Sequence, residues 1–246
     1  MTLTTDAKGL ACMSDQLDFK LGVIFDCDGT LLDSTDVWHS VEEDLAQRGN
    51  GTLLSKADHD LLTTMTIAES ATFLHEKFEV GIDGLDVQHM IAEFMHDYYA
   101  HKSIMRPGVK EFVEGLAHLG VPMACASSTP SDLLHEGLEH VGLAPFFRVI
   151  VSVDDVHSSK RDPKVYDTAR KALDTTRSET WGFEDAIYAI RTLKAAGYRT
   201  MGVYDSDGSG TYADLSATAT RVLRTFEDIT SQEFVALARR IAQSEK

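Results

Sequence analysis

Hydrophobic and polar positions first separate clearly at residues 23–25, where a Val-Ile-Phe run is followed by a polar turn. These residues are β-branched or aromatic, which favours a buried strand. The turn contains Asp26, Asp28 and Gly29, and glycine interrupts the strand pattern. The sequence therefore predicts a strand that ends with two carboxylates at its tip.

Residues 35–103 contain no convincing strand pattern. Apolar residues recur there at the spacing of amphipathic helices, and this spacing indicates helix core rather than a ligand site. The predicted helices are a first one through Trp38, Val41 and Leu45 that ends at Arg48–Gly51, followed by residues 56–65, 67–78 and 87–101. This segment is predicted to be an all-helical insert.

From Arg106-Pro107-Gly108 onward, strand and helix patterns alternate. The predicted strands are residues 121–126, 148–153, 179–183 and 198–204. The predicted helices are residues 107–119, with Pro107 in the first turn, then 131–141, a helix after Pro163 that runs to residue 173, 186–196 and 232–243. Such alternation is typical of a parallel sheet in an α/β protein, which is the predicted fold class.

Polar residues end the predicted strands and converge on one edge of the sheet. With right-handed crossovers, every strand of a parallel sheet ends on the same edge, and ligands bind there. The residues concerned are Asp26 and Asp28, Ser127, Glu184 and Asp185, with Lys160 in the loop after a further strand. Turns without a shared function would rarely place carboxylates, a hydroxyl group and an ammonium group at successive strand ends.

Asp26 and Asp28 are two residues apart, so on an extended backbone both side chains point to the same side. Two carboxylates this close repel each other unless a cation lies between them or one of them takes a proton. Carboxylate and carbonyl oxygens suit Mg²⁺, which commonly takes a further ligand from a substrate phosphate. The spacing of Asp26 and Asp28 therefore favours a protein that acts on phosphate groups. The sequence Asp-x-Asp-Gly is, however, also common in ordinary turns.

Each of the other strand-end residues also has a structural interpretation. Ser127 is a typical cap for the helix that follows it. Lys160 can also be interpreted as a solvated lysine in a loop. Lys164, four residues later, is an alternative candidate for the same role at the sheet edge. The pair Glu184-Asp185 also fits an ordinary helix start, where the helix dipole favours acidic residues.

Composition and charge narrow the class of protein. The chain has 246 residues and a net charge of −16, which argues against nucleic acid and anionic membrane as partners. Cys12, Cys27 and Cys125 form no CxxC pair, and a sparse, odd count fits a reducing cytoplasm. Residues 1–18 lack the apolar stretch of a signal peptide and are predicted to be a disordered leader.

Residues 21–204 resemble the haloacid dehalogenase-like hydrolase superfamily, specifically the branch that contains phosphoglycolate phosphatase and β-phosphoglucomutase. Four motifs match in order and spacing: FDCDGTLLDS at residues 25–34, Ser127 in ACASST, Lys160 in SSKRDPKVYDTA, and Glu184-Asp185 in GFEDAIYAIRTLKAAG. The resemblance implies a Rossmann-like catalytic core of residues 19–34 and 104–246. It also implies a helical cap domain of residues 35–103 that closes over the site.

The resemblance assigns a catalytic role to several residues. Asp26 is the expected nucleophile and becomes an aspartyl phosphate, while Asp28 acts as general acid and then as general base. Ser127 and Lys160 are expected to hold the phosphate oxygens, above a tight backbone turn at Gly29.

The same resemblance implies a Mg²⁺ site and a kind of substrate. The expected metal residues are Asp26, Asp28 through its carbonyl, Asp185, and Glu184 directly or through water. The expected activity is Mg²⁺-dependent hydrolysis of a small phosphorylated metabolite by a cytoplasmic monomer.

Three other functions on this fold are weighed against the phosphatase. A sugar phosphomutase of the β-phosphoglucomutase kind uses a cap histidine, but Trp38 occupies its place here and His39 comes one residue later. Residues 51–103 also contain no arginine for a second phosphate. A dehalogenase does not normally carry an acid at the position of Asp28. A non-catalytic binding protein has no chemical need for the complete set of motif residues.

Two remaining features are interpreted as structural. Asp205–Gly210 resembles a calcium loop, but Ser216 stands where an EF-hand needs glutamate, so a loop at a strand end is predicted. Cys27 is interpreted as a small buried core residue, because adjacent carboxylates would raise the pKa of its thiol and slow its oxidation.

Overall fold

The computed structural model describes residues 17–244, and the first 16 residues of the predicted leader lie outside this range. One sheet of six parallel strands has the order β3-β2-β1-β4-β5-β6. The strands are β1 (Gly22–Phe25), β2 (Met123–Ser127), β3 (Phe147–Ser152), β4 (Thr180–Glu184), β5 (Arg199–Val203) and β6 (Arg221–Leu223). The predicted α/β fold with a parallel sheet is confirmed.

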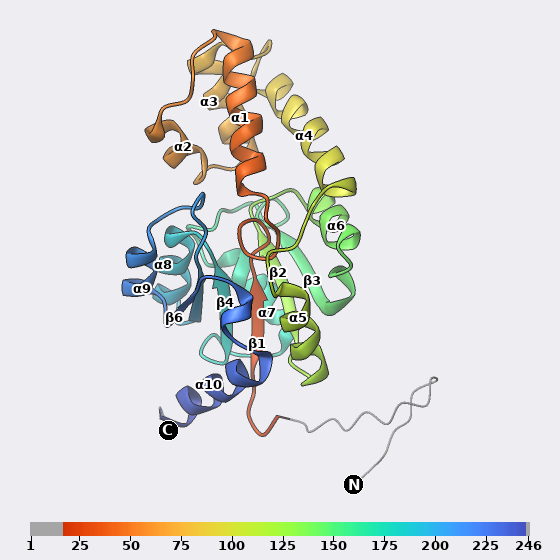
Figure 1. Cartoon of the computed structure of the whole chain (residues 1–246), viewed down its shortest axis with the longest axis vertical. Helices are drawn as coiled ribbons and strands as arrows, with labels where there is room; N and C mark the ends of the chain where they lie inside the picture. The colour runs from red at the N-terminus through yellow and green to blue at the C-terminus, as the bar shows by residue number, and fades with distance from the viewer. Residues whose placement is uncertain (1–16, 245–246) are drawn as a thin grey trace.

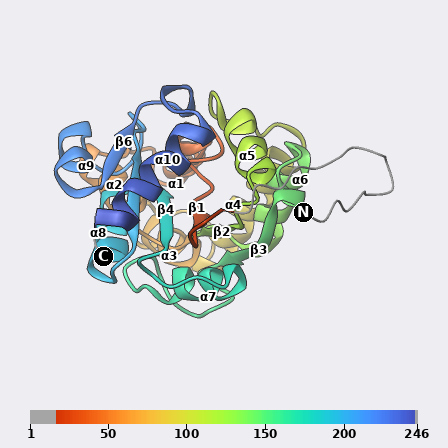
Figure 2. The ribbon, with the colours of Figure 1, turned by 90° about the horizontal axis from the view of Figure 1, so that it is seen from below.

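The central strand β1 is buried on both faces of the sheet (Figure 2). Phe25 packs with Phe112 and Phe183 on the face that α5 (Val109–His118) and α10 (Ser231–Ser244) cover. Ile24 belongs to the cluster on the opposite face, beneath α7 (Lys164–Leu173) and α8 (Ile187–Ala195). Burial on both faces explains why the strand reads as a continuous apolar run rather than an alternating one.

The insert is all-helical, as predicted, and lies beyond the carboxyl edge of the sheet (Figure 1). Its helices are α1 (Thr35–Gly49), α2 (Lys56–Leu62), α3 (Ile67–Phe78) and α4 (Gly84–His101). Ser55 and Thr66 close capping boxes at the starts of α2 and α3. Asp83 caps α4, so this helix begins three residues earlier than the apolar spacing predicts.

The two connections between the insert and the sheet pair with each other. Leu32 and Met105 form an antiparallel bridge. The Asp33 amide donates to the Ile104 carbonyl at 2.9 Å. The insert therefore leaves and re-enters the sheet region at one place, beside the end of β1.

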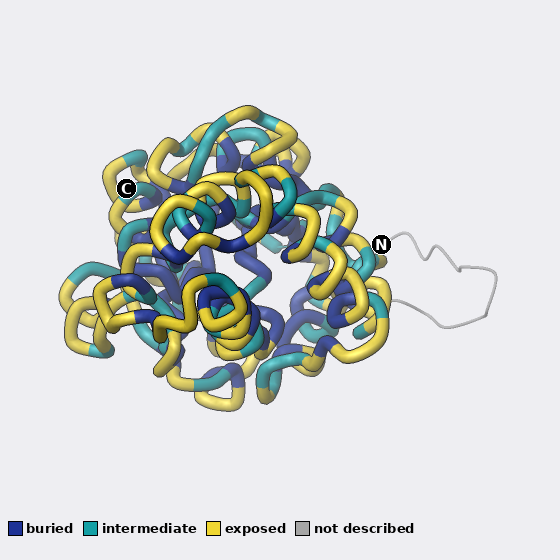
Figure 3. The backbone as a smooth tube through the Cα atoms, turned by 90° about the horizontal axis from the view of Figure 1, so that it is seen from above, coloured by how far each residue is buried: buried dark blue, intermediate teal, exposed yellow. Residues whose placement is uncertain are grey.

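Helix α4 continues down to the sheet region and packs against α6 (Ser131–His140). A Cβ atom at Gly137 of α6 would lie 2.5 Å from the Tyr99 ring of α4, so glycine permits this close approach. Seen from the side of the insert, the buried segments lie inside an outer layer of exposed turns and helix faces (Figure 3).

Three local predictions are wrong or incomplete. Pro107 lies outside α5, which begins at Val109 after Gly108, because a φ of 79° at Gly108 places it in the left-handed region. A Cβ atom at Gly108 would lie 2.7 Å from the Glu227 amide nitrogen, so the chain needs glycine there. The short elements α9 (Tyr212–Thr218) and β6 were not predicted.

Within residues 17–244, no helix combines the length and apolar character needed to cross a bilayer.

Candidate active site

The residues after β1 fold back in a tight turn. The Gly29 amide donates to the Leu32 carbonyl, and the Leu32 amide donates to the Cys27 carbonyl, both at 2.9 Å. Gly29 has a φ of 73°, which disfavours a side chain, and a Cβ atom there would lie 2.8 Å from Asp185 Oδ2. Glycine therefore lets the turn bring Asp26 and Asp28 close to the end of β4.

Lys160 lies between two buried carboxylates. Its ammonium group forms ion pairs with Asp26 and, at 2.7 Å, with Glu184, whose Oε1 also accepts a hydrogen bond from Tyr166 at 2.7 Å. Burial lowers the pKa of Lys160, but the charges of Asp26 and Glu184 outweigh this effect and raise it well above the usual value. Lys160 is therefore a permanent cation at the end of the central strand.

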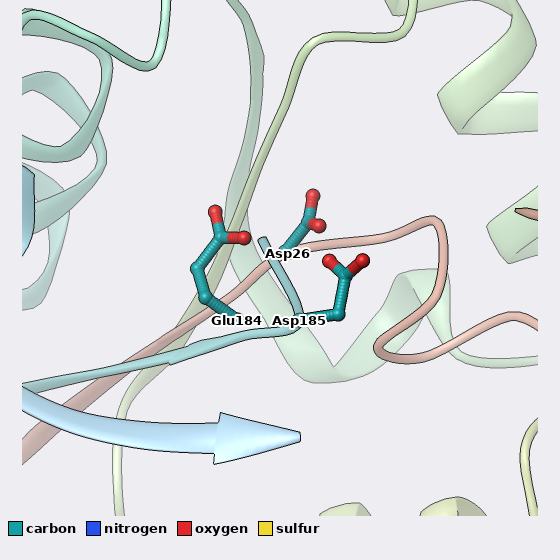
Figure 4. A group of neighbouring side chains, drawn as sticks. All are labelled: Asp26, Glu184 and Asp185. Carbon is teal, nitrogen blue, oxygen red and sulfur yellow. The ribbon is translucent and has the colours of Figure 1, made fainter. Parts of the chain in front are cut away.

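Asp26, Glu184 and Asp185 form a cluster in which ligand oxygens lie within 4.8 Å of one another. Figure 4 shows their carboxylates on the same side of the chain, with Asp26 coming from the end of β1 and the other two from the end of β4. Burial, and then the charge of Asp26, raises the pKa of Glu184 to about 8. The same causes raise the pKa of Asp185 well above its usual value.

This cluster fits a divalent cation. Glu184 Oε2 is buried and accepts no hydrogen bond from any residue in the range 17–244. Asp185 Oδ2 lies close to two backbone positions, because a Cβ atom at Gly208 would approach it to 2.7 Å and one at Gly29 to 2.8 Å. Hard oxygens, excess negative charge and an unsatisfied acceptor suit Mg²⁺.

Asp28 lies outside this cluster and is held by hydroxyl groups. Its Oδ1 accepts hydrogen bonds from Ser34 at 2.6 Å and from Tyr99, and its Oδ2 accepts one from Thr129 at 2.7 Å. The Tyr99 hydroxyl in turn accepts a hydrogen bond from the Trp38 indole nitrogen at 3.1 Å. Burial and the charge of Asp28 raise the pKa of Tyr99, so its phenol stays protonated and donates.

The structural interpretations of the other motif residues are wrong. Ser127 is buried at the end of β2 and accepts from the Thr129 amide at 3.1 Å, while Pro130 occupies the N-cap of α6. Lys160 is 4% exposed, whereas Lys164 is exposed and donates to a backbone carbonyl. Glu184 is the last residue of β4 rather than part of a helix start.

The predicted site residues other than Gly29 and Glu184 line one cavity with about 840 Å³ of empty space, part of it open to solvent. From the sheet side it is lined by Asp26, Asp28, Ser127, Lys160 and Asp185, among others. From the insert it is lined by residues that include Trp38, His39, Glu42, Met65, Ser70 and Ile91. The structure therefore brings together residues that the sequence predicted separately at four strand ends.

The loop Asp205–Gly210 has a structural use. Asp205 forms an ion pair with Arg106 at 3.0 Å and accepts a hydrogen bond from Thr35 at 2.9 Å. Its carboxylate therefore ties the loop after β5 to the start of α1 and to the connection that returns from α4. This agrees with the prediction of a loop at a strand end.

Cys27 is fully buried and contacts Cys125, and both thiols are free. A hydrogen bond with Cys125, burial and the charge of Asp28 raise the pKa of Cys27 well above its usual value, in decreasing order of effect. The predicted direction is therefore correct, but the neighbouring thiol and burial matter more than the carboxylates. Burial and a raised thiol pKa are typical of structural rather than reactive cysteines.

Sequence reasoning missed the residues that orient the predicted ones. Thr129 carried a weak signal, because it lies two residues after Ser127. Tyr99 carried none, because it reaches Asp28 from a helix far along the chain. Tyr166 lies in the motif quoted for Lys160 and Gly208 in the loop Asp205–Gly210, but neither stretch indicated their contacts with Glu184 and Asp185.

Residues 23–203 match the family of haloacid dehalogenase-like hydrolases, and the chain belongs to this family. Curated relatives include a phosphorylated carbohydrates phosphatase of Thermotoga maritima, with 27% identity over 76% of this chain and 87% of the relative. A phosphoglycolate phosphatase of Pseudomonas putida has 27% identity over 74% of this chain and 68% of its own. These findings confirm the resemblance based on the four motifs.

A solved structure supports the fold. The β-phosphoglucomutase of Clostridium difficile superposes with a TM-score of 0.74 over 91% of this chain and 99% of its own, at 17% identity. At this identity the likeness establishes a shared architecture and carries no information about the substrate.

Proposed function

We propose that the protein is a Mg²⁺-dependent phosphatase that hydrolyses a small phosphorylated metabolite through an aspartyl phosphate on Asp26. The observation that carries this proposal is the environment of Asp26. Its carboxylate lies at the end of the central strand, pairs with Lys160, belongs to the carboxylate cluster with Glu184 and Asp185, and lines the cavity. The phosphatase names of the curated relatives support the reaction type, phosphoric monoester hydrolysis.

Two steps account for the reaction. In the first, an Asp26 oxygen attacks phosphorus, the bond to the leaving oxygen breaks, and Asp28 gives that oxygen a proton. In the second, water attacks phosphorus, Asp28 takes a proton from the water, and inorganic phosphate leaves Asp26. The Ser127 hydroxyl and the Lys160 ammonium hold the phosphoryl oxygens, and Lys160 offsets their repulsion from Asp26.

Asp26, Glu184 and Asp185 would hold Mg²⁺, together with the Asp28 carbonyl that the family resemblance implies. When bound, the ion withdraws charge from the phosphoryl oxygens and orients the phosphate. The tight turn at Gly29 supports the phosphate site from below. Glu184 and Asp185 come from β4, which lies beside β1 in the sheet, so the site is assembled on two adjacent rigid strands.

We also propose the domain division that the sequence suggested. Residues 19–34 and 104–246 form the catalytic core, and residues 35–103 form a cap that excludes water from the cavity. The paired connections at Leu32 and Met105 support a common hinge for the cap. Action as a monomer and a cytoplasmic location stay predictions.

The first test is phosphate release from a panel of sugar phosphates, nucleotides and short-chain phosphoesters, with Mg²⁺ or with EDTA. We expect release that depends on Mg²⁺ and is lost in Asp26→Asn. Asp33→Asn is the matched control, since it makes the same change at an exposed carboxylate and should leave the activity unchanged. Activity that survives in Asp26→Asn would contradict the proposed nucleophile.

The phosphomutase alternative receives less support from the structure. Trp38, in the place of the mutase histidine, is hydrogen-bonded to Tyr99 through its indole nitrogen. Conversion of a hexose 1-phosphate to the 6-phosphate, without net phosphate release, would nevertheless establish the mutase instead.

A further inference from the structure

The two sides of the cavity differ in the partners of their ionisable side chains, once Glu184 Oε2, the free acceptor that suits a metal ion, is set aside. On the sheet side, Asp26 and Lys160 pair with each other, and Asp28 accepts hydrogen bonds from hydroxyl groups. On the cap side, apolar residues and small hydroxyl residues line the cavity, and Glu42 and His39 are the ionisable groups there. They lie three residues apart and therefore on the same side of α1.

Glu42 is a buried carboxyl group without a partner. Its residue is 6% exposed and lines the cavity, and no hydrogen bond or ion pair joins its carboxylate to any residue in the described part of the chain. Burial raises its pKa to about 8. A buried carboxylate without a partner is costly, so its side chain is an unfavourable choice for a purely structural position.

Asp58, in the same cap, provides the contrast. It is also 6% exposed, yet its carboxylate accepts hydrogen bonds from the Ser55 amide and hydroxyl and pairs with Lys77. These partners lower its pKa to about 2. The cap therefore satisfies a buried carboxylate where the role is structural. A molecule in the cavity can supply the partner that the described chain does not give Glu42.

The charge of the cavity indicates which group that molecule carries. Lys160 is the one lysine or arginine among the lining residues of the described chain, and Asp26 and Glu184 engage it. Burial and the neighbouring His59 lower the pKa of His39, so its imidazole is neutral near pH 7. Near pH 7 the Glu42 carboxyl group stays protonated while it has no partner, and an ammonium group beside it would favour the carboxylate and pair with it. A second phosphate or a carboxylate would find no lysine or arginine among the described lining residues of the cap side.

The length of α1 sets the size of the leaving group. Glu42 is seven residues beyond Thr35, which also lines the cavity near Asp28. Seven residues correspond to about 10 Å along a helix axis. An extended chain covers about 3.3 to 3.6 Å for every three atoms, so a chain of roughly eight or nine atoms spans such a distance.

We propose that Glu42 binds an amino group of the leaving alcohol, so that the substrates are phosphomonoesters of amino alcohols, amino sugars included. This inference rests on the proposed phosphatase activity and assigns its substrate class. Glu42 is then a specificity residue that contacts the substrate far from the reacting phosphorus, while Asp26 and Asp28 carry out the chemistry.

The test uses linear esters of equal length that differ only in the terminal group. They are the monophosphates of 6-aminohexanol, 1,6-hexanediol and hexanol, and of 6-hydroxyhexanoate. For the wild-type protein with Mg²⁺, we expect the amino ester to have the highest kcat/KM and the carboxylate ester the lowest. An ion pair in a buried site corresponds to an advantage of roughly 30-fold or more for the amino ester over the hexyl ester.

Glu42→Gln removes the charge while keeping the shape of the side chain. We expect this variant to lose the preference for the amino ester through a higher KM for that ester. Glu43→Gln is the matched control, because Glu43 is the next residue on α1, does not line the cavity, and accepts from the Leu54 amide, as glutamine also would. It should keep the wild-type order of esters.

The outcomes separate this inference from the proposed function. Phosphate release without a preference for the amino ester, or the same preference in Glu42→Gln, would overturn the role of Glu42 and leave the phosphatase standing. Equal kcat/KM for the amino and 1,6-hexanediol esters would show that Glu42 binds hydroxyl groups without requiring a cation, which also overturns it. No release from these esters or from the broader panel would overturn both proposals.

Discussion

The sheet edge and the cap enclose one cavity but treat buried charge in opposite ways. At the sheet edge, Asp28 accepts hydrogen bonds from hydroxyl groups and Lys160 pairs with two carboxylates. On the cap face, Glu42 is as deeply buried and has no partner in the described chain. The paired groups of the sheet edge are preorganised for one reaction, and the acceptor left over there, Glu184 Oε2, suits a metal ion. Glu42 is instead completed by the molecule that binds in the cavity.

The largest effect on this difference is expected when Lys160, the cation of the sheet edge, is removed. Lys160→Met leaves Asp26 and Glu184 buried without their common partner, which should lower the free energy of unfolding by about 3 to 5 kcal/mol and abolish phosphate release. Urea unfolding in EDTA measures the stability. Lys164→Met, at an exposed lysine, should change neither quantity. Equal stability of Lys160→Met and wild type would show that Lys160 does not stabilise these carboxylates.

Glu42→Gln should raise the free energy of unfolding instead of lowering it, because it removes a carboxyl group whose pKa burial raises to about 8. Between pH 4.5 and pH 8 the folded protein holds this proton more firmly than the unfolded chain, so the group costs stability as pH rises. The variant should therefore gain on the order of 3 kcal/mol relative to wild type between pH 4.5 and pH 8.5. Urea unfolding at both pH values, without substrate, measures this. A difference that is independent of pH would contradict the raised pKa.

Gly208→Ala perturbs the sheet edge more gently. The new methyl group would lie 2.7 Å from Asp185 Oδ2, so the carboxylate must move. We expect the Mg²⁺ concentration for half-maximal activity to rise about 10-fold, the effect typical of disturbing a metal ligand indirectly. Ser206→Ala, an exposed position in the same loop, serves as the control. An unchanged Mg²⁺ dependence would argue against Asp185 as a ligand.

Tyr99→Phe tests the point where the cap reaches the sheet edge. It removes one of the hydroxyl donors of Asp28, and the loss of one hydrogen bond corresponds to roughly a 5-fold lower kcat, with KM little changed. Tyr98→Phe is the control, because its hydroxyl donates to the Asp33 carbonyl instead. If both variants lose kcat equally, packing of α4 rather than the contact with Asp28 is responsible.

Much of the sheet edge could be predicted because its signals come from residues that are neighbours in the sequence. The apolar run before Asp26 specifies a buried strand, and the order of strands then places Ser127 and Glu184 on the same edge. The predicted helix at residues 67–78 matches α3 because a capping box at Thr66 fixes its start. These signals depend on neighbouring residues, which a sequence displays directly.

The rest depends on contacts between distant segments. Tyr99 reaches Asp28 across 71 positions in the chain. No local pattern distinguishes it from Tyr98. Glu42 reads as one more polar residue on a helix, and only the packing of the cap buries it. The short α9 and β6 span too few residues to display a period.

The antiparallel pairing of Leu32 with Met105 has a consequence for how this protein changes during evolution. The 70 or so residues between the two connections begin and end at neighbouring points, and the entropy of closing such a loop depends only weakly on its length. Helical segments of different size and sequence can therefore be exchanged at this place without altering the order of the strands. If the cap selects the leaving group as proposed, one such exchange would give the same sheet edge a new set of substrates.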